Sequence, residues 1–155
     1  MTNVLVVRAN NRPDGISTKM YETFIAEAAT VEGLNVSTFD VFEENLAYFG
    51  QELFNAFGKL QNGEALTAME QASFDSMNKA RTALDAAEVV VFAFPLWNQT
   101  IPAALQSFID YTYGAGYSFK YNEQGQLVSL MNDKKYIVLN ARGGNYSNPA
   151  MSSME

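Results

Sequence analysis

Cysteine and histidine are both missing from this 155-residue chain. Without cysteine there are no disulfides, no thiolate nucleophile and no cysteine-ligated metal. Without histidine the chain lacks the usual general base of a Ser-His-Asp triad and the commonest zinc ligand. An enzyme with this composition must therefore take its difficult chemistry from a cofactor or a hard metal ion. We assign no metal-binding residues.

Basic residues are also scarce, because 10 Lys and Arg stand against 17 Asp and Glu, for a net charge of −7. This balance argues against nucleic acid as a partner, since phosphate backbones bind to a basic surface; it is also a common solubility device. No apolar run approaches the roughly 20 residues of a membrane span, and the first residues do not resemble a signal peptide. We therefore expect one cytoplasmic domain, residues 1–155, without nucleic-acid or membrane partners.

Short apolar runs alternate with helical patterns along the chain. We predict four strands, at residues 4–7, 34–39, 89–94 and 136–140. We expect the first to be buried on both faces and the last to be a core strand. Helical spacing predicts three helices, between residues 17 and 33, 65 and 87, and 101 and 112. Residues 117–130 predict a hairpin, and residues 40–64 are interpreted as an ordered loop with short helical pieces. Alternating strands and helices imply an α/β fold, with a parallel sheet covered by helices on both faces.

Three loops follow strands of this predicted sheet, and carboxyl ends of parallel strands meet at one edge. Residues 10–18 lead into a helix N-terminus, whose free N–H groups and dipole suit a phosphate. Residues 95–99 offer Trp97 as a stacking face, and residues 141–144 combine Arg142 with two glycines that allow close approach to the backbone. The shared edge favours one site for a phosphate, a planar ring and the polar rim of that ring.

Each loop also has an ordinary structural interpretation. Ser17 or Thr18 serves only as a helix N-cap, Trp97 packs in the core, and residues 142–144 form a surface turn. The sequence pattern alone leaves these alternatives open.

Five stretches of the chain carry a family resemblance: VLVVRANNRP (4–13), FPLWNQTIP (94–102), FIDY (108–111), FKY (119–121) and LNARGGNYS (139–147). They resemble the FMN-dependent NADH-azoreductases, flavodoxin-like enzymes that also reduce quinones. The resemblance covers the whole chain and implies a flavodoxin-like, doubly wound parallel sheet in three α/β/α layers. Family members continue for another strand and helix, so it also implies a chain truncated at its C-terminus.

The same resemblance implies where FMN lies. The phosphate would lie near Asn10 and the segment Gly15-Ile16-Ser17, where the family often has Ser-x-Ser and this chain has glycine first. Tyr121 matches a position that approaches the substrate face across a homodimer interface. The residues that would line the isoalloxazine and its polar edges are Pro95, Leu96, Trp97, Asn98, Gln99, Ala141, Arg142, Gly143 and Gly144.

The implied activity is ping-pong transfer of a hydride from NADH, through flavin N5, to an azo compound or a quinone. The flavin carries this chemistry, so no catalytic side chain is assigned. Two alternatives stay open: a flavodoxin-like carrier of single electrons, and a catalytically inactive truncated fragment. An NTP-binding domain is disfavoured, because the chain has neither a Gly-x-x-x-x-Gly-Lys-Ser/Thr loop nor a Gly-x-Gly-x-x-Gly after its first strand.

Overall fold

The computed structural model describes residues 1–144 and residue 147. A parallel sheet holds four strands in the order β2 (Leu34–Asp40), β1 (Thr2–Arg8), β3 (Val89–Pro95) and β6 (Lys135–Ala141). The chain starts in the middle of the sheet, runs outward to β2, and then returns past β1 to β3. This reversal is the switch point of a doubly wound sheet. All four predicted strands are confirmed.

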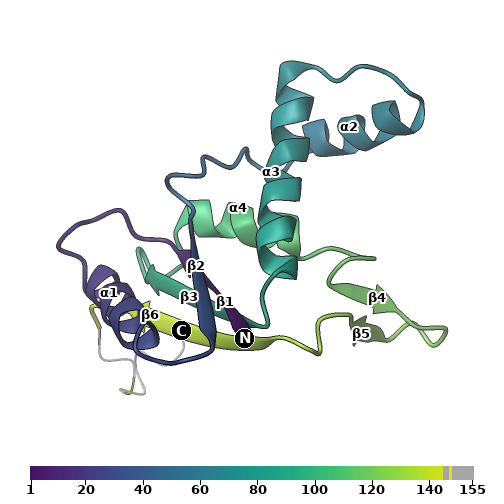
Figure 1. The fold of residues 1–155 in the computed structure, drawn as a ribbon. Helices are drawn as coiled ribbons and strands as arrows, with labels where there is room; N and C mark the ends of the chain where they lie inside the picture. Colours follow the sequence, from purple (N-terminus) through teal and green to yellow (C-terminus); the bar gives the residue numbers. More distant parts are fainter. Residues whose placement is uncertain (145–146, 148–155) are drawn as a thin grey trace.

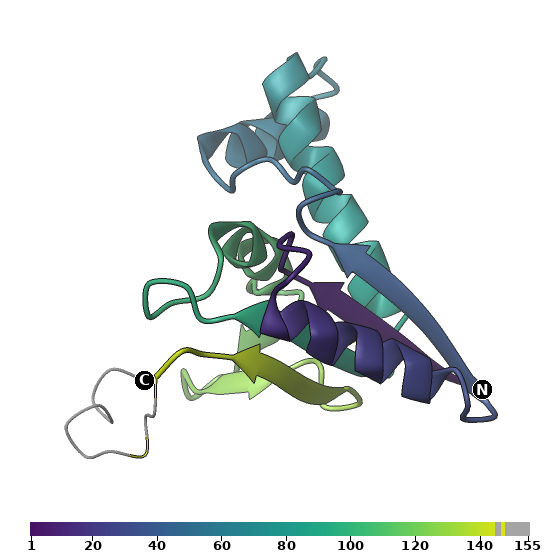
Figure 2. The ribbon, with the colours of Figure 1, turned by 90° about the vertical axis from the view of Figure 1, so that its left-hand side faces the viewer.

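Helices cover both faces of the sheet. Helix α1 (Ile16–Ala28) lies across one face, and α3 (Ala68–Asp85) and α4 (Ala103–Thr112) lie on the other (Figures 1 and 2). Successive side chains of a strand point to opposite faces, so Val4 and Val6 of β1 pack toward α1. The predicted flavodoxin-like, three-layer α/β/α arrangement is confirmed.

The opposite face of β1 belongs to the larger core. Leu5 and Val7 pack there with Leu105 and Phe108 of α4 and with the buried side of α3. Val6 and Val7 are completely buried, which is why residues 4–7 form a continuous apolar run rather than an alternating one. Each fully buried valine contributes about 1.5–3 kcal/mol relative to an exposed one.

Residues 40–64 hold more helix than we predicted. Helix α2 (Gln51–Gln61) is a regular helix of 11 residues, and it stands away from the sheet together with the start of α3 (Figures 1 and 2). Only Leu53 and Ala56 of α2 are buried, whereas Phe54 and Phe57 are exposed. Leu53, Phe57 and Leu60 recur at helical spacing, but Phe57 and Leu60 are exposed, and Gly58, which indicates a loop in the sequence, lies within the helix.

Two apolar residues that lie at helical spacing in the sequence are exposed. Met69 in α3 and Val31, which lies beyond the end of α1, expose 67% and 53% of their surface. Helix α3 begins instead with a reciprocal capping box between Thr67 and Glu70. Met69 therefore belongs to the projecting first turn, and the buried stripe begins at Glu70.

The predicted hairpin is confirmed as antiparallel strands β4 (Phe119–Tyr121) and β5 (Leu127–Ser129). Tyr117 fixes its base, because its hydroxyl donates to Asp85 at 2.8 Å and its ring lies 4.2 Å below the Arg81 guanidinium carbon. Figure 1 shows the hairpin at the right, away from α1 at the left.

Strand β6 forms the edge of the described sheet. Its residues Tyr136, Ile137 and Val138 are exposed, because β6 has a neighbouring strand on one side alone among the described residues. The prediction that residues 136–140 form a core strand is therefore wrong, although the strand itself is present. Among the helices of residues 1–144, none is long and apolar enough to cross a bilayer.

Candidate functional site

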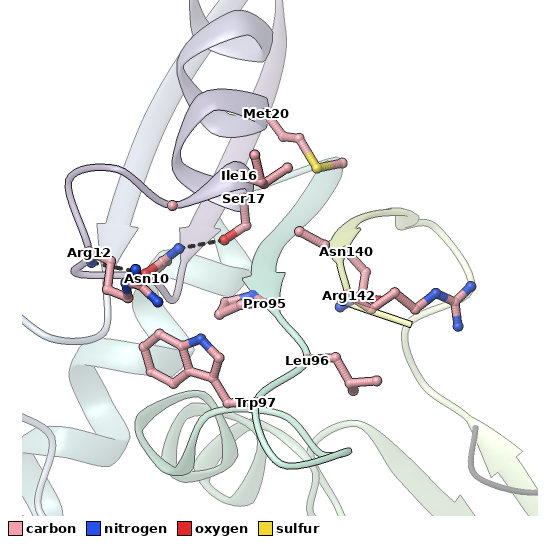
Figure 3. Close-up of a pocket in the computed structure, with 13 residues that line it drawn as sticks. Asn10, Arg12, Ile16, Ser17, Met20, Pro95, Leu96, Trp97, Asn140 and Arg142 are labelled. Atoms are coloured by element: carbon pink, nitrogen blue, oxygen red, sulfur yellow. Dashed lines mark hydrogen bonds between the residues drawn. The ribbon is translucent and has the colours of Figure 1, made fainter. Parts of the chain in front are cut away.

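A cavity of about 460 Å³ opens at the carboxyl edge of the sheet (Figure 3). Its volume falls within the roughly 300–1,000 Å³ of small-molecule sites. It lies beside the switch point between β1 and β3, where doubly wound sheets bind ligands. The lining residues are Asn10, Arg12, Gly15, Ile16, Ser17, Met20, Pro95, Leu96, Trp97, Asn140, Ala141, Arg142 and Gly143.

One end of the cavity is the N-terminus of α1. The first intrahelical bond runs from Lys19 N to Gly15 O at 3.1 Å, so the N–H groups of Ile16, Ser17 and Thr18 lie ahead of it. Such N–H groups and the positive end of the helix dipole favour an anion. The geometry at this end therefore suits a phosphate.

The prediction that Ser17 or Thr18 is the N-cap is wrong. The N-cap is Gly15, whose backbone is extended and which offers no side chain to cap the helix. Ser17 and Thr18 lie in the first turn and are buried. Thr18 Oγ1 donates to the Arg12 carbonyl at 2.8 Å, so this hydroxyl holds the loop against the helix.

Asn10 connects the loop to the helix start. Its side chain is almost completely buried, with 2% exposed. Oδ1 accepts the Arg12 N–H at 2.9 Å, and Nδ2 donates to Ser17 Oγ at 2.7 Å (Figure 3). Since Ser17 Oγ accepts from the amide, its own hydrogen remains to be donated to a ligand.

The loop after β3 forms a second wall. Pro95, Leu96 and Trp97 line the cavity, and Leu96 N donates to the Ala141 carbonyl at 2.7 Å, which ties this loop to the end of β6. Figure 3 shows the Trp97 ring below Asn10 and Pro95. A half-buried aromatic ring that lines the cavity, close to a helix N-terminus that suits a phosphate, fits a planar ligand that carries a phosphate.

Asn98 and Gln99 do not line this cavity, although we predicted that they would. They form a tight turn in which Thr100 N donates to the Trp97 carbonyl at 3.0 Å, and both have left-handed backbones, with φ of 53° and 64°. The turn directs them elsewhere: Asn98 lines a neighbouring hollow together with Tyr48, and Gln99 lines another hollow near β6.

The end of β6 and the loop after it form the third wall. Ala141, Arg142 and Gly143 line the cavity as predicted, and Gly144 does not. Asn140 was missed, although its side chain lines the cavity and donates to the Phe94 carbonyl at 3.2 Å. Its position at the strand end, directly before Ala141, was the available signal.

Two other lining residues were missed. Arg12 lies within the predicted loop, where only turn formation was considered. Met20 lies at helical spacing in α1, and its side chain reaches the cavity. Tyr121 lies in β4, is 63% exposed, and is separate from this cavity.

Positive charge dominates the lining. Among the residues that line the cavity, only Arg12 and Arg142 are charged, and both are cations, although the chain has a net charge of −7. Arg12 makes an exposed ion pair with Asp14 at 3.3 Å, a contact of small energy that a ligand can replace. The cavity is therefore locally suited to an anionic ligand.

Comparison with known proteins identifies relatives of the whole chain. A family model described as "Flavodoxin-like fold" matches residues 2–155. The FMN-dependent NADH:quinone oxidoreductase of Brevibacillus brevis is 45% identical, over 100% of this chain and 76% of that protein. FMN-dependent NADH:quinone oxidoreductase 1 of Bacillus subtilis is 41% identical over the same shares. The crystal structure of an azoreductase from Bacillus anthracis superposes with a TM-score of 0.88 at 42% identity, over 100% of this chain and 76% of that one. The chain belongs to the flavodoxin-like family that contains these NADH:quinone oxidoreductases and azoreductases.

Proposed function

We propose that this protein is an FMN-dependent NADH oxidoreductase that reduces quinones or azo compounds. The observation that carries the proposal is the cavity itself, which brings a helix N-terminus, an indole and two arginines to one sheet edge. Relatives that are 41–45% identical and carry the name FMN-dependent NADH:quinone oxidoreductase support the same cofactor and donor.

The residues present fit FMN. Asn10, Ser17 and the first N–H groups of α1 offer donors to a phosphate. Trp97 offers an apolar face to a planar ring, because it lines the cavity between β3 and α1. At Gly143, a built Cβ would meet no atom within 4 Å, so a ring can approach the backbone there.

FMN, when bound, would supply two-electron hydride chemistry through its N5 in a ping-pong exchange between NADH and the acceptor. The residues of the chain would bind the flavin and orient its ring in the cavity. Pro95 and Leu96 give one wall of the cavity an apolar lining, and Arg142 would bring a positive charge that favours a reduced, negatively charged ring. Because the chain lacks His and Cys, we assign proton delivery to water rather than to a side chain.

Homodimerisation and a cytoplasmic location complete the proposal. Tyr121 is exposed and does not line the cavity, and its hairpin lies away from α1 (Figure 1). A substrate-contacting role for Tyr121 therefore requires that it reach the cavity of a second copy.

A stopped-flow experiment tests the proposed reaction. The protein is reconstituted with FMN and mixed with NADH alone, and absorbance near the flavin maximum is followed. We expect rapid bleaching by NADH and recovery of the colour when a quinone or azo dye is added. An electron carrier requires a separate reductase, so FMN-loaded protein that NADH leaves unreduced would favour the carrier.

A thermal melt with and without FMN tests the alternative that the chain is a catalytically inactive fragment. A ligand that binds only the folded state raises Tm. We expect a cooperative transition that FMN moves to higher temperature. A transition that FMN leaves unchanged, or no transition, would support the inactive fragment.

A further inference from the structure

Gly15 occupies a position where its backbone does not require glycine. Its φ of −70° and ψ of 141° are ordinary extended values that any residue adopts. A Cβ built on Gly15, however, would overlap Asn10 Nδ2 and would lie 3.3 Å from Asn10 Cγ and from the Arg12 carbonyl oxygen. Glycine is therefore needed here for space, and the space is taken by the Asn10 carboxamide.

The Asn10 carboxamide is held firmly in that space. Its oxygen accepts from Arg12 N at 2.9 Å and its nitrogen donates to Ser17 Oγ at 2.7 Å. The side chain is also buried. Rotating it away from a larger residue at position 15 would break both bonds and leave buried polar groups without partners, which is costly.

The same carboxamide is a donor directed at the anion end of the cavity. An amide nitrogen carries two hydrogens, and in the described part of the chain Ser17 Oγ is the only acceptor of Asn10 Nδ2. Asn10, Gly15, Ile16 and Ser17 all line the cavity. The second amide hydrogen and the Ser17 hydroxyl are therefore available beside the first N–H groups of α1.

We propose that Asn10 and Gly15 form a matched pair that selects phosphorylated over unphosphorylated flavin. The missing side chain at position 15 leaves the space that the Asn10 carboxamide occupies, and its hydrogen bond to Ser17 aligns the second amide hydrogen as a phosphate donor. This inference rests on the proposed function, because it assigns the FMN phosphate to the α1 end of the cavity.

The test compares dissociation constants for FMN and riboflavin, measured by quenching of flavin fluorescence. A lost hydrogen bond to a charged group corresponds to about tenfold or more in affinity. We expect Gly15→Ser and Gly15→Ala to weaken FMN binding by about tenfold or more, and to leave riboflavin binding within about twofold of the wild type. Asn10→Ala, which keeps Gly15, should show the same selective loss.

The double variant Asn10→Ser/Gly15→Ser tests whether the two positions act as a pair. The smaller side chain at position 10 removes the overlap, and the serine at position 15 brings a hydroxyl donor. We expect FMN affinity to recover at least half of the loss seen in Gly15→Ser, on a logarithmic scale. The matched control is Gly58→Ala in α2, where the added Cβ meets no atom within 4 Å, and both flavin affinities should remain unchanged.

Three results would overturn the inference. Gly15→Ser and Asn10→Ala variants that bind FMN like the wild type would show that the pair does not select the phosphate. An equal loss of FMN and riboflavin affinity would place the damage in the fold or the ring site. A wild-type protein that binds neither flavin would refute the proposed function and this inference together, whereas the first two results leave the proposed function standing.

Discussion

The two ends of the cavity are built in different ways. At the α1 end, Asn10, Ser17 and Thr18 are buried. Asn10 Nδ2 donates to Ser17 Oγ at 2.7 Å and Thr18 Oγ1 donates to the Arg12 carbonyl at 2.8 Å, which pre-arranges the donors. At the other end, Trp97 precedes an exposed turn in which Asn98 and Gln99 have left-handed backbones. The left-handed conformation costs a non-glycine residue roughly 1–2 kcal/mol.

This difference suggests a division of labour. The buried end recognises a small charged group by fixed geometry, and such networks tolerate little change. The exposed end recognises a flat surface, which depends on area rather than on aligned hydrogen bonds. Substitutions at the two ends should therefore separate phosphate recognition from ring recognition.

The largest effect is expected from Gly143→Val. Its side chain would occupy space in the wall of the cavity where a Cβ meets no protein atom. The apo-protein should melt at an unchanged temperature, while FMN and riboflavin binding both weaken by about a hundredfold, since a blocked ring site loses contacts worth several kcal/mol. Normal flavin content in this variant would remove the loop after β6 from the site.

Trp97→Ala should have a smaller effect that falls equally on both flavins. Loss of a large aromatic contact corresponds to about 2 kcal/mol, or roughly thirtyfold in dissociation constant. Fluorescence titration with FMN and riboflavin measures the loss. The control is Tyr113→Ala, because Tyr113 is an exposed aromatic residue at the C-terminal end of α4 that does not line the cavity. A loss confined to FMN would contradict the proposed division between the ends.

Gln99→Gly should stabilise the protein slightly. Glycine adopts the left-handed backbone of this turn without strain, and its greater freedom in the unfolded chain offsets part of the gain, so we expect about 0.5–1 kcal/mol. Urea unfolding of the apo-protein measures the change. Asn98→Gly should gain less, because asparagine tolerates the left-handed region better. A larger gain at Asn98 than at Gln99 would argue against strain as the cause.

A change of pH should affect a region outside the cavity. Glu70 accepts hydrogen bonds from Lys59 Nζ and from Thr67 N, both at 2.7 Å, and these bonds hold the pKa of the Glu70 carboxyl below its usual 4.5. A pKa lowered by folding contributes stability that is present above about pH 4.5 and is lost as pH falls through the folded-state value.

Glu70→Gln measures this contribution. The free energy of unfolding should be lower than in the wild type at pH 7, and the difference should shrink below about pH 4.5. FMN affinity at pH 7 should not change, because Glu70 lies at the junction of α2 and α3. The exposed Glu22→Gln is the control. A difference that stays constant from pH 7 to pH 3 would contradict a role of the Glu70 charge.

The strands of the sheet were predictable because burial selects apolar residues, and those residues are visible in the sequence. Residues 4–7 and 89–94 are buried on both faces or nearly so, which produces continuous runs of valine and phenylalanine. Helix α2 was missed although Leu53, Phe57 and Leu60 recur at helical spacing, because the glycines at 50, 58 and 63 indicated a loop. Gly50 and Gly63 flank the helix, and Gly58 lies inside it.

The site was predictable at the level of loops and less so at the level of side chains. Strand order brings residues 10–17, 95–97 and 141–143 to one edge, as the loop positions implied. The left-handed backbones of Asn98 and Gln99 could not be predicted, because neither residue is glycine. The role of Gly15 was also hidden, because it depends on where the Asn10 side chain lies.

Calorimetric titration of the apo-protein with FMN and with riboflavin tests the central claim most directly. The account predicts one FMN bound per chain, with riboflavin weaker by about tenfold or more, because it lacks the charged group that the α1 end recognises. Absence of FMN binding, or equal affinity for the two flavins, would contradict it.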